Sequence, residues 1–296
     1  MSTRHPIIAV TGSSGAGTTT VKETFEQIFW REYVTAAFVE GDSFHRYTRA
    51  EIAQRIVAAE REGRPAPSHF GPEGNDFEAL EGLYREYADT GRGTFRRYIH
   101  DEVEAARWGG EVGGFTQPEE IPEGTDLLFY EGLHGAVKTE TVDVSTYPDL
   151  LIGVVPTINL EWIQKLLRDT RLRGYSREAV TNTILRRMPD YVHYMTPQFS
   201  RTHINFQRVP VVDTSNPFIA RDVPSQDESF VVIRFANPRG IDFPYLLAMI
   251  DGAFMSRANT LVTPGGKMPL AMQLILTPLI WKLVEQGRKI RNGTRG

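Results

Sequence analysis

A glycine-rich turn at residues 12–19 constrains this chain more than any other feature of its sequence. The apolar run 7–10 before it predicts a short buried strand, and residues 18–31 after it carry apolar side chains at helical spacing. The turn reads Gly12-Ser13-Ser14-Gly15-Ala16-Gly17-Thr18-Thr19 and matches the phosphate-loop pattern G-x-x-x-x-G-K-[ST], except that Thr18 takes the place of lysine. Such a loop points backbone N–H groups and a helix N-terminus at anionic oxygens. The sequence therefore predicts a phosphate site, with the Thr19 hydroxyl placed to bind Mg²⁺.

Two other interpretations of the turn are a tight glycine turn without a ligand and a dinucleotide-binding turn. The dinucleotide pattern G-x-G-x-x-G fails because Thr20 follows Gly15 and Gly17 at the position of the third glycine. The lysine that is missing at Thr18 normally reaches the outer phosphates of a nucleotide. If the site transfers phosphate, a cation must therefore come from elsewhere in the chain.

Strand-like runs alternate with helical patterns, which predicts an α/β fold with a mostly parallel or mixed sheet flanked by helices. The expected strands are 7–10, 36–40, 127–131, 150–155, 209–212 and 230–235, and the expected helices are 18–31, 49–62, 77–87, 159–173, 176–188 and 268–284. Two breaker-rich stretches, 63–76 and 107–125, are expected to be loop insertions on a single domain that spans residues 1–296.

Composition excludes several classes of function. The chain has no cysteine, so a disulfide scaffold, a thiolate zinc site, a thiol nucleophile and thiol-based regulation are ruled out. A formal net charge of −4 gives no sign of a nucleic-acid partner. Since the sequence shows neither a secretory signal pattern nor an uninterrupted apolar run of membrane-spanning length, a cytoplasmic protein without a membrane partner is expected.

Acidic residues follow the second and third expected strands, where ligands bind in open α/β sheets. Asp42 can accept a proton from a substrate hydroxyl or help to hold Mg²⁺, and His45 and Arg49 suit an anionic substrate. Glu131 has the position of a metal-side carboxylate. The alternatives are a helix-capping aspartate with surface His and Arg, and an ordinary acidic strand end; His134 is ambiguous.

The expected helix 159–173 is rich in cations. At 100° per residue, Lys165, Asp169 and Arg173 share a stripe opposite the apolar face, with Arg168 beside it. For the helix alone, the favoured interpretation is a solvated face whose ion pairs contribute a few tenths of a kcal/mol each. The lysine missing at Thr18 changes this balance, because Lys165 and Arg168 could restore the charge that a phosphoryl group needs.

The segment 165–178 also fits the signature K-[LIVM]-x-R-D-x3-R-G-x-[ST]-x-E at every defined position. With the phosphate loop and the stretches EGDSFHRY, YEGLHG and VPVVDTSNPF, the chain resembles the bacterial, cysteine-free phosphoribulokinases over nearly its whole length. The resemblance implies a phosphate-loop core like that of nucleoside-monophosphate kinases. It also implies the ATP-dependent phosphorylation of D-ribulose 5-phosphate to D-ribulose 1,5-bisphosphate in the Calvin cycle.

The resemblance further implies roles for individual residues. Asp42 would be the general base, Lys165 would stabilise the transferring phosphoryl group, and Asp169 would be a metal-side or catalytic carboxylate. Residues 12–19 would bind ATP, and Thr19 and Glu131 would bind Mg²⁺. The residues implied to hold the sugar phosphate are His45, Arg49, Tyr98, His100, Arg168 and Arg173.

Regulation and assembly are implied in the same way: NADH as activator, AMP as inhibitor, and a homo-oligomer. Arg234 and Arg257 are candidates for the effector response, although the sequence alone favours surface arginines. Two other functions stay open at this point. One is a uridine-kinase-like enzyme for a nucleoside or another small alcohol, and the other is a nucleotide-binding regulator without turnover.

Overall fold

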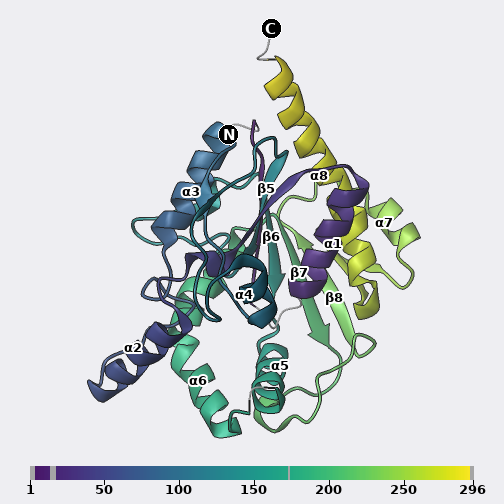
Figure 1. Ribbon diagram of the computed structural model, residues 1–296. Helices are drawn as coiled ribbons and strands as arrows, with labels where there is room; N and C mark the ends of the chain where they lie inside the picture. Colours follow the sequence, from purple (N-terminus) through teal and green to yellow (C-terminus); the bar gives the residue numbers. More distant parts are fainter. Residues whose placement is uncertain (1–3, 14–17, 173, 294–296) are drawn as a thin grey trace.

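A mixed sheet forms the centre of the molecule (Figure 1). The computed structural model describes residues 4–13, 18–172 and 174–293, the side chains of 18–20 excepted. Within these ranges eight strands pair in the order β2-β5-β1-β6-β7-β8-β10-β9. They are β1 (Ile7–Gly12), β2 (Ala36–Glu40), β5 (Leu127–Gly132), β6 (Leu150–Val155), β7 (Ile204–Pro210), β8 (Ser229–Phe235), β9 (Phe254–Arg257) and β10 (Thr260–Pro264).

The five strands from β2 to β7 are parallel, and β8, β10 and β9 continue the sheet in antiparallel pairs. The carboxyl ends of the parallel strands therefore share one edge, where ligands bind in sheets of this kind. A separate pair, β3 (Thr94–Phe95) and β4 (Glu119–Glu120), lies outside the main sheet.

Helices cover both faces of the sheet and one end of it (Figure 1). On one face α1 and α8 pack around Phe25, Phe129 and Ile275; on the other, α3 packs around Leu80, Tyr84 and Tyr130. The helices are α1 (Thr18–Arg31), α2 (Arg49–Arg61), α3 (Phe77–Thr90), α4 (Glu102–Trp108), α5 (Ile158–Arg171), α6 (Arg177–Asp190), α7 (Phe243–Met249) and α8 (Met268–Gly293).

The predicted fold class is confirmed, and the sheet is mixed. Several predicted segments differ in their bounds, and the loop expected at 107–125 contains the end of α4 and the short strand β4. The late strand expected at 209–212 is β7, which begins at Ile204 and ends at Pro210. The helix expected to stop at Met188 runs through Pro189 to Asp190 and continues as a π-helical turn, Tyr191–Met195. A proline lacks the N–H for the usual intrahelical bond, and a widened turn follows it here instead of a chain break.

The segment after the π turn, Thr196–Ser200, delivers a fully buried glutamine to the ends of two strands. Gln198 Oε1 accepts hydrogen bonds from Thr11 Oγ1 on β1 and from the Ala136 N–H, both at 3.0 Å. Its amide nitrogen donates to the carbonyl of Leu133, just beyond β5, at 2.9 Å. The amide is thereby satisfied on both sides and ties this segment to β1 and β5.

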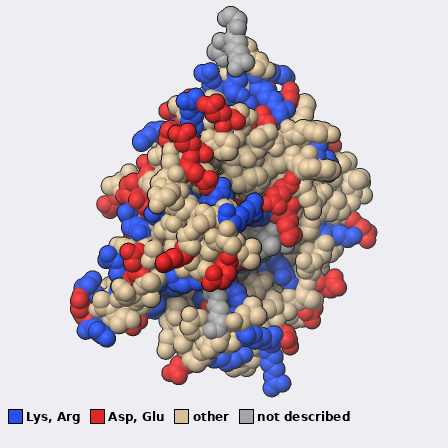
Figure 2. All heavy atoms as spheres, in the orientation of Figure 1, with Lys and Arg blue, Asp and Glu red and all other residues tan. Residues whose placement is uncertain are grey.

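Helix α8 is long and apolar. By length and composition alone, the segment Gly265–Gly293 could cross a membrane, a property that core helices share. Met272, Leu276 and Ile280 of this helix are fully buried in the core beside α1. On the face shown in Figure 2, acidic and basic side chains are interspersed, without a field of one sign.

The carboxyl half of α8 is fastened to the start of β5 by Asp126. Arg288 donates two hydrogen bonds to this carboxylate, at 2.8 and 2.7 Å, and the Thr35 N–H donates a third at 3.0 Å. Burial raises the pKa of Asp126, but the hydrogen bonds from Arg288 and Thr35 outweigh it, so the pKa is lowered. Asp126 is therefore ionised and stabilises the fold.

We predict that Asp126→Ala lowers the free energy of unfolding by about 2–3 kcal/mol, because Arg288 and the Thr35 N–H lose a partly buried anionic partner. Urea denaturation at neutral pH measures this. Since the pKa is lowered in the folded state, the contribution is complete above the ordinary carboxyl pKa and is lost as the pH falls through the lowered value. The matched control is Glu123→Ala, which removes an exposed pair with Arg92 and should change stability by less than about 1 kcal/mol. Equal effects of the two substitutions would contradict the role of Asp126.

Candidate active site

Strand register brings the predicted residues to one edge of the sheet. Glu131 on β5 stands opposite Val10 on β1 and Glu40 on β2. The 3₁₀ turn Gly41–Phe44 follows β2 directly and carries Asp42. Thus the end of β1, the metal-side carboxylate and the candidate base are neighbours at the carboxyl ends of three adjacent strands.

Two glycines allow the turn to lie against β5. A Cβ on Gly132 would come within 2.6 Å of the Gly41 Cα and 2.7 Å of the Tyr130 hydroxyl. A Cβ on Gly41 would meet the same hydroxyl at 2.7 Å. Contacts this short cannot be accommodated without moving the backbone, so the placement of Asp42 depends on both positions being glycine.

Only the two ends of the predicted phosphate loop fall in the described part of the chain. Gly12 ends β1, where a Cβ would meet the Val154 carbonyl at 2.8 Å, and Ser13 is buried. Ser14, Gly15, Ala16 and Gly17 lie outside the described residues. Thr18 and Thr19 begin α1, and their side chains are also outside the description. The strand–loop–helix order that the motif requires is present.

Asp42 lies between two imidazoles. Its Oδ1 is 3.2 Å from Nε2 of His45, and its Oδ2 is 3.7 Å from Nε2 of His100, beyond hydrogen-bond distance. The Asp42 side chain is 37% exposed and the His45 side chain only 8% exposed. One carboxylate oxygen is thus held by a buried histidine, and the other has no hydrogen bond to either imidazole.

Burial raises the pKa of Asp42, but the hydrogen bond from His45 and the positive charge of the neighbouring imidazoles outweigh it and lower the pKa to about 2. Asp42 is therefore ionised at neutral pH. So weak a base cannot take a proton from a free alcohol. It can orient the hydroxyl and receive its proton as the new O–P bond makes that oxygen acidic.

Four of the six residues predicted to hold the sugar phosphate gather around Asp42, whereas Arg168 lies on α5 beside Asp169. The ring of Tyr98 lies edge-on to those of His45 and His100, with centroids 5.7 and 5.0 Å away. Arg49 donates from Nη2 to the His100 carbonyl at 3.2 Å, and its side chain is exposed. The structure therefore brings His45, Arg49, Tyr98 and His100 together with Asp42, from three separate segments.

Glu131 lies among like charges. Burial raises its pKa to about 7, the charges of Glu40 and Asp42 add to this, and Lys22 opposes it. Lys22 itself is paired with Glu40 at 2.7 Å. Carboxylates that converge with too little positive charge are the donor chemistry that suits Mg²⁺, so these residues fit the ion. Within the described residues, no cluster of three or more His, Asp or Glu side chains forms a complete metal site.

The cationic helix α5 differs from the sequence prediction. Asp169, expected on a solvated stripe, is buried, with its side chain only 6% exposed. It accepts from Lys165 Nζ at 2.6 Å and from Arg168 Nε at 3.1 Å. The solvated-face interpretation therefore does not hold for Asp169, and Arg187 of α6 lies near enough to interact with it electrostatically. Arg173 lies outside the described residues.

Helix α5 reaches the phosphate loop through Glu161, one turn before Lys165. Burial raises the pKa of Glu161, and polar contacts with the Ser13 and Tyr191 hydroxyls and the charge of Lys165 offset only part of the rise. The Tyr191 hydroxyl donates to Glu161 Oε2 at 3.1 Å. Glu161 lies close to Ser13, and Lys165 is one turn further along the same helix face. The Lys165 side chain is 23% exposed and is paired with Asp169, so it does not point into bulk water.

Sequence reasoning missed three residues around this cluster. Asn75 and His69 belong to the breaker-rich loop 63–76, and Arg96 donates to the backbone carbonyls of Ser43 and His45. An asparagine in a loop has no signal of its own in a single sequence. The ambiguous His134 is buried, with Nε2 3.1 Å from the Phe70 carbonyl; burial lowers its pKa to about 3, so it is a neutral packing residue.

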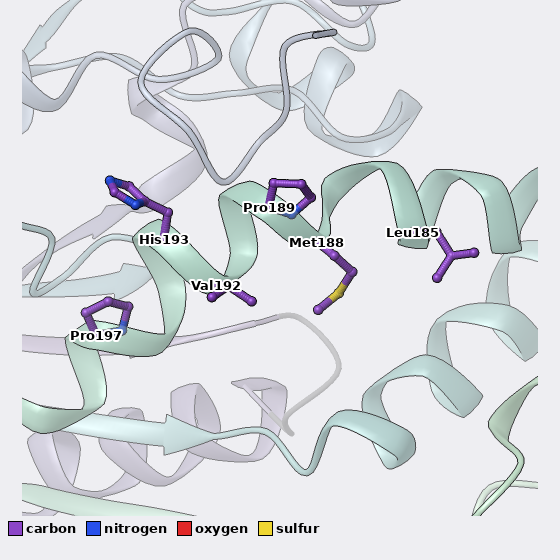
Figure 3. Close-up of a pocket in the computed structure, with 6 residues that line it drawn as sticks. All are labelled: Leu185, Met188, Pro189, Val192, His193 and Pro197. Carbon is purple, nitrogen blue, oxygen red and sulfur yellow. The ribbon is translucent and has the colours of Figure 1, made fainter.

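Two cavities lie away from this cluster. The larger, about 680 Å³, is lined by Leu185, Met188, Pro189, Val192, His193 and Pro197 (Figure 3). Its walls are mostly apolar and include none of the predicted catalytic residues among those described. The other, about 540 Å³, is lined on one side by Arg234 and Arg257, so these two arginines, 23 positions apart, share one pocket.

Comparisons with known proteins agree with this geometry. The sequence profile of the Phosphoribulokinase / Uridine kinase family matches residues 7–215. The chromosomal phosphoribulokinase of Cupriavidus necator is 65% identical over 289 residues, which is 98% of this chain and 99% of the relative. The phosphoribulokinase of Nitrobacter vulgaris is 63% identical over 286 residues, 97% of this chain and 99% of the relative. The chain belongs to the phosphoribulokinase family.

The fold also matches that of a solved member of the family. A solved phosphoribulokinase structure from Rhodobacter spheroides matches with a TM-score of 0.90 at 57% identity. The match covers 97% of this chain and all of that one. The resemblance inferred from the loop and the signature segment is therefore confirmed at the level of family, fold and enzyme class.

We predict that Gly132→Ala lowers kcat by about tenfold to a hundredfold, because its Cβ displaces the turn that carries Asp42. Steady-state kinetics well below the unfolding temperature measure this. The matched control is Gly82→Ala, which has no atom within 4 Å of the added Cβ and should leave kcat unchanged. A normal kcat in Gly132→Ala would show that the turn tolerates displacement.

Proposed function

We infer that this chain catalyses the ATP-dependent phosphorylation of D-ribulose 5-phosphate at its 1-hydroxyl, giving D-ribulose 1,5-bisphosphate for carbon fixation. The observation that carries this is the position of Asp42, an ionised carboxylate at the same sheet edge as the end of the phosphate-loop strand and one strand away from it, in a chain that matches phosphoribulokinases over 98% of its length. The donor is ATP, because the activity of the family is a kinase activity.

The phosphates of ATP are proposed to lie on residues 12–19, where backbone N–H groups and the N-terminus of α1 favour anions. Thr19 and Glu131 would hold Mg²⁺, which when bound supplies positive charge to the outer phosphates. The raised pKa of Glu131 supports this, because a carboxylate crowded by Glu40 and Asp42 gains most from a nearby cation.

The cations of α5 are proposed to take the place of the lysine that is absent at Thr18. Lys165 and Arg168 are both anchored on Asp169, which holds them in one region of the helix rather than in free solution. Charge balance on the γ-phosphoryl group would then come from Lys165, and Asp169 would act by positioning it. Arg173 is proposed to bind the sugar phosphate with Arg168.

On the side of the acceptor sugar, Asp42 accepts the proton of the attacking hydroxyl. His45, Arg49, Tyr98 and His100 surround it and are proposed to hold the far phosphate and the sugar chain. Fixing that phosphate confines the 1-hydroxyl near Asp42, so that binding energy is used to align the in-line attack.

Regulation by NADH and AMP, assembly into a homo-oligomer and a cytoplasmic location are part of the same proposal. The pocket that contains Arg234 and Arg257 supports an anionic effector there, since two guanidinium groups at one cavity suit phosphates. The sequence alone had favoured isolated surface arginines.

A coupled assay of ADP formation with ribulose 5-phosphate, with and without NADH, tests the function directly. A panel of uridine and other small alcohols under the same conditions tests the nucleoside-kinase alternative. Turnover with uridine but not ribulose 5-phosphate would reject the proposed substrate. ATP binding without ADP release on any acceptor would favour the regulator.

We predict that Asp42→Ala lowers kcat by about 10²–10⁴-fold while ATP binding persists, because the residue acts on the acceptor hydroxyl and not on the nucleotide. Single-turnover kinetics and calorimetric ATP titration measure the two effects separately. A near-normal kcat would remove Asp42 from the role of base.

We predict that Lys165→Met lowers kcat by about 10²–10³-fold with little change in KM for ribulose 5-phosphate, because the ammonium acts on charge in the transition state. Lys138→Met is the matched control, since it removes another lysine–aspartate pair, with Asp143, at an exposed position. A loss confined to KM for ATP would instead make Lys165 a ground-state binding residue.

A further inference from the structure

We propose that Asn75 is a positioning residue: it accepts the Nδ1 hydrogen of His45, so that His45 holds Asp42 only as an imidazolium. The proposal rests on the proposed function, in which Asp42 is the base. It assigns a role to the loop 63–76, which the sequence predicts only as a loop insertion.

The orientation of the Asn75 amide is fixed by its neighbours. Its Nδ2 donates to the carbonyls of His69 at 3.0 Å and Gly71 at 2.8 Å. A flipped amide would set its oxygen against both carbonyls. Asn75 is 1% exposed, so solvent cannot relieve such a clash. Its Oδ1 must therefore face His45 Nδ1, 2.8 Å away, and must accept a hydrogen bond from it.

This contact determines where the protons of His45 lie. Nδ1 must carry a hydrogen, because the amide oxygen can only accept. Nε2 faces the Asp42 carboxylate oxygen at 3.2 Å, which also can only accept when ionised. The bond to Asp42 therefore forms when both ring nitrogens are protonated. With Asn75 in place, the carboxylate is therefore paired with a cation.

The backbone keeps the three residues in line. His45 and Asn75 form an isolated antiparallel bridge. The Arg46 N–H donates to the Gly74 carbonyl at 2.9 Å, and the Asp76 N–H donates to the Phe44 carbonyl at 2.8 Å. The loop is thus paired with the turn that carries Asp42, so the contact of Asn75 with His45 is built into the backbone.

The other groups around His45 are consistent with a charged ring. Burial lowers the pKa of His69, whose ring centroid is 4.7 Å away, to about 3, so His69 is neutral. His134 is neutral for the same reason. Arg96 opposes the charge, and His100 lies on the far side of Asp42. Burial lowers the pKa of His45, but the bonds to Asp42 and Asn75 outweigh it, and the pKa is raised.

The cation serves the reaction in two ways. It orients Asp42 through Oδ1, which leaves Oδ2 for the substrate hydroxyl, and it places a positive charge where a sugar phosphate binds. Both are lost when His45 deprotonates, so activity should fall at alkaline pH as one proton is lost. Removing the Asn75 acceptor should bring that fall to lower pH.

The test is the pH dependence of kcat/KM for ribulose 5-phosphate in the wild-type enzyme and in Asn75→Leu. We expect the alkaline limb, the fall of kcat/KM at high pH, to occur about one pH unit lower in the variant. At pH 8, kcat/KM should then be about tenfold lower than in the wild type, while its value at low pH is nearly unchanged. Ser68→Ala is the matched control. It removes a hydrogen bond to Asp190 from the same loop and should leave the limb in place.

A double-mutant cycle separates positioning from simple destabilisation. In His45→Gln the alkaline limb should be absent, and adding Asn75→Leu should then cause no further shift. An alkaline limb that persists in His45→Gln, or that is unmoved in Asn75→Leu, overturns the proposal. The His45→Gln profile decides this even if Asn75→Leu fails to fold. Absence of wild-type turnover with ribulose 5-phosphate would instead reject the proposed function itself.

Discussion

The parallel pairing of β2, β5 and β1 is the constraint on which the site depends. It sets Glu40, Glu131 and the end of β1 side by side, and the contact between Gly41 and Gly132 then places Asp42 against the same edge. The chemistry of the site follows from that proximity. Burial and the neighbouring carboxylates raise the pKa of Glu131, and Asp42 is kept ionised by the hydrogen bond from the buried His45. One edge thus offers both an oxygen-rich position for a cation and an anion for the acceptor.

Much of this could be read from the sequence, because local pattern determines the elements that matter most. The helix after the glycine turn and the strand 36–40 have their predicted bounds, and the residues at strand ends could be placed from the rule for parallel sheets. The features that the sequence did not predict depend on tertiary packing. Asp169 lies on the polar side of its helix by periodicity, yet its side chain is buried in the folded chain. Asn75 depends on a loop that folds back on Asp42, and such loops carry no period.

The absent loop lysine also shows how the chain distributes charge. Asp169 holds both Lys165 and Arg168 within one turn of α5, and Glu161 of the same helix lies close to Ser13. The cations that we propose to replace this lysine thus belong to an element that is separate from the loop. Their distance from the phosphates is therefore set by how α5 packs, not by the loop itself, which links the packing of α5 and α6 to the reaction.

The π turn Tyr191–Met195 makes the number of residues in this segment important for the side chains that follow it. A π turn takes up more residues than an α turn, so it changes the rotational phase of every side chain that follows. Gln198 follows this turn and reaches Thr11 and Leu133 from the orientation that the turn leaves it in. Deleting a single residue between 191 and 195 would turn this amide away from both strands. Residue count in this stretch is therefore under as strict a geometric requirement as residue identity.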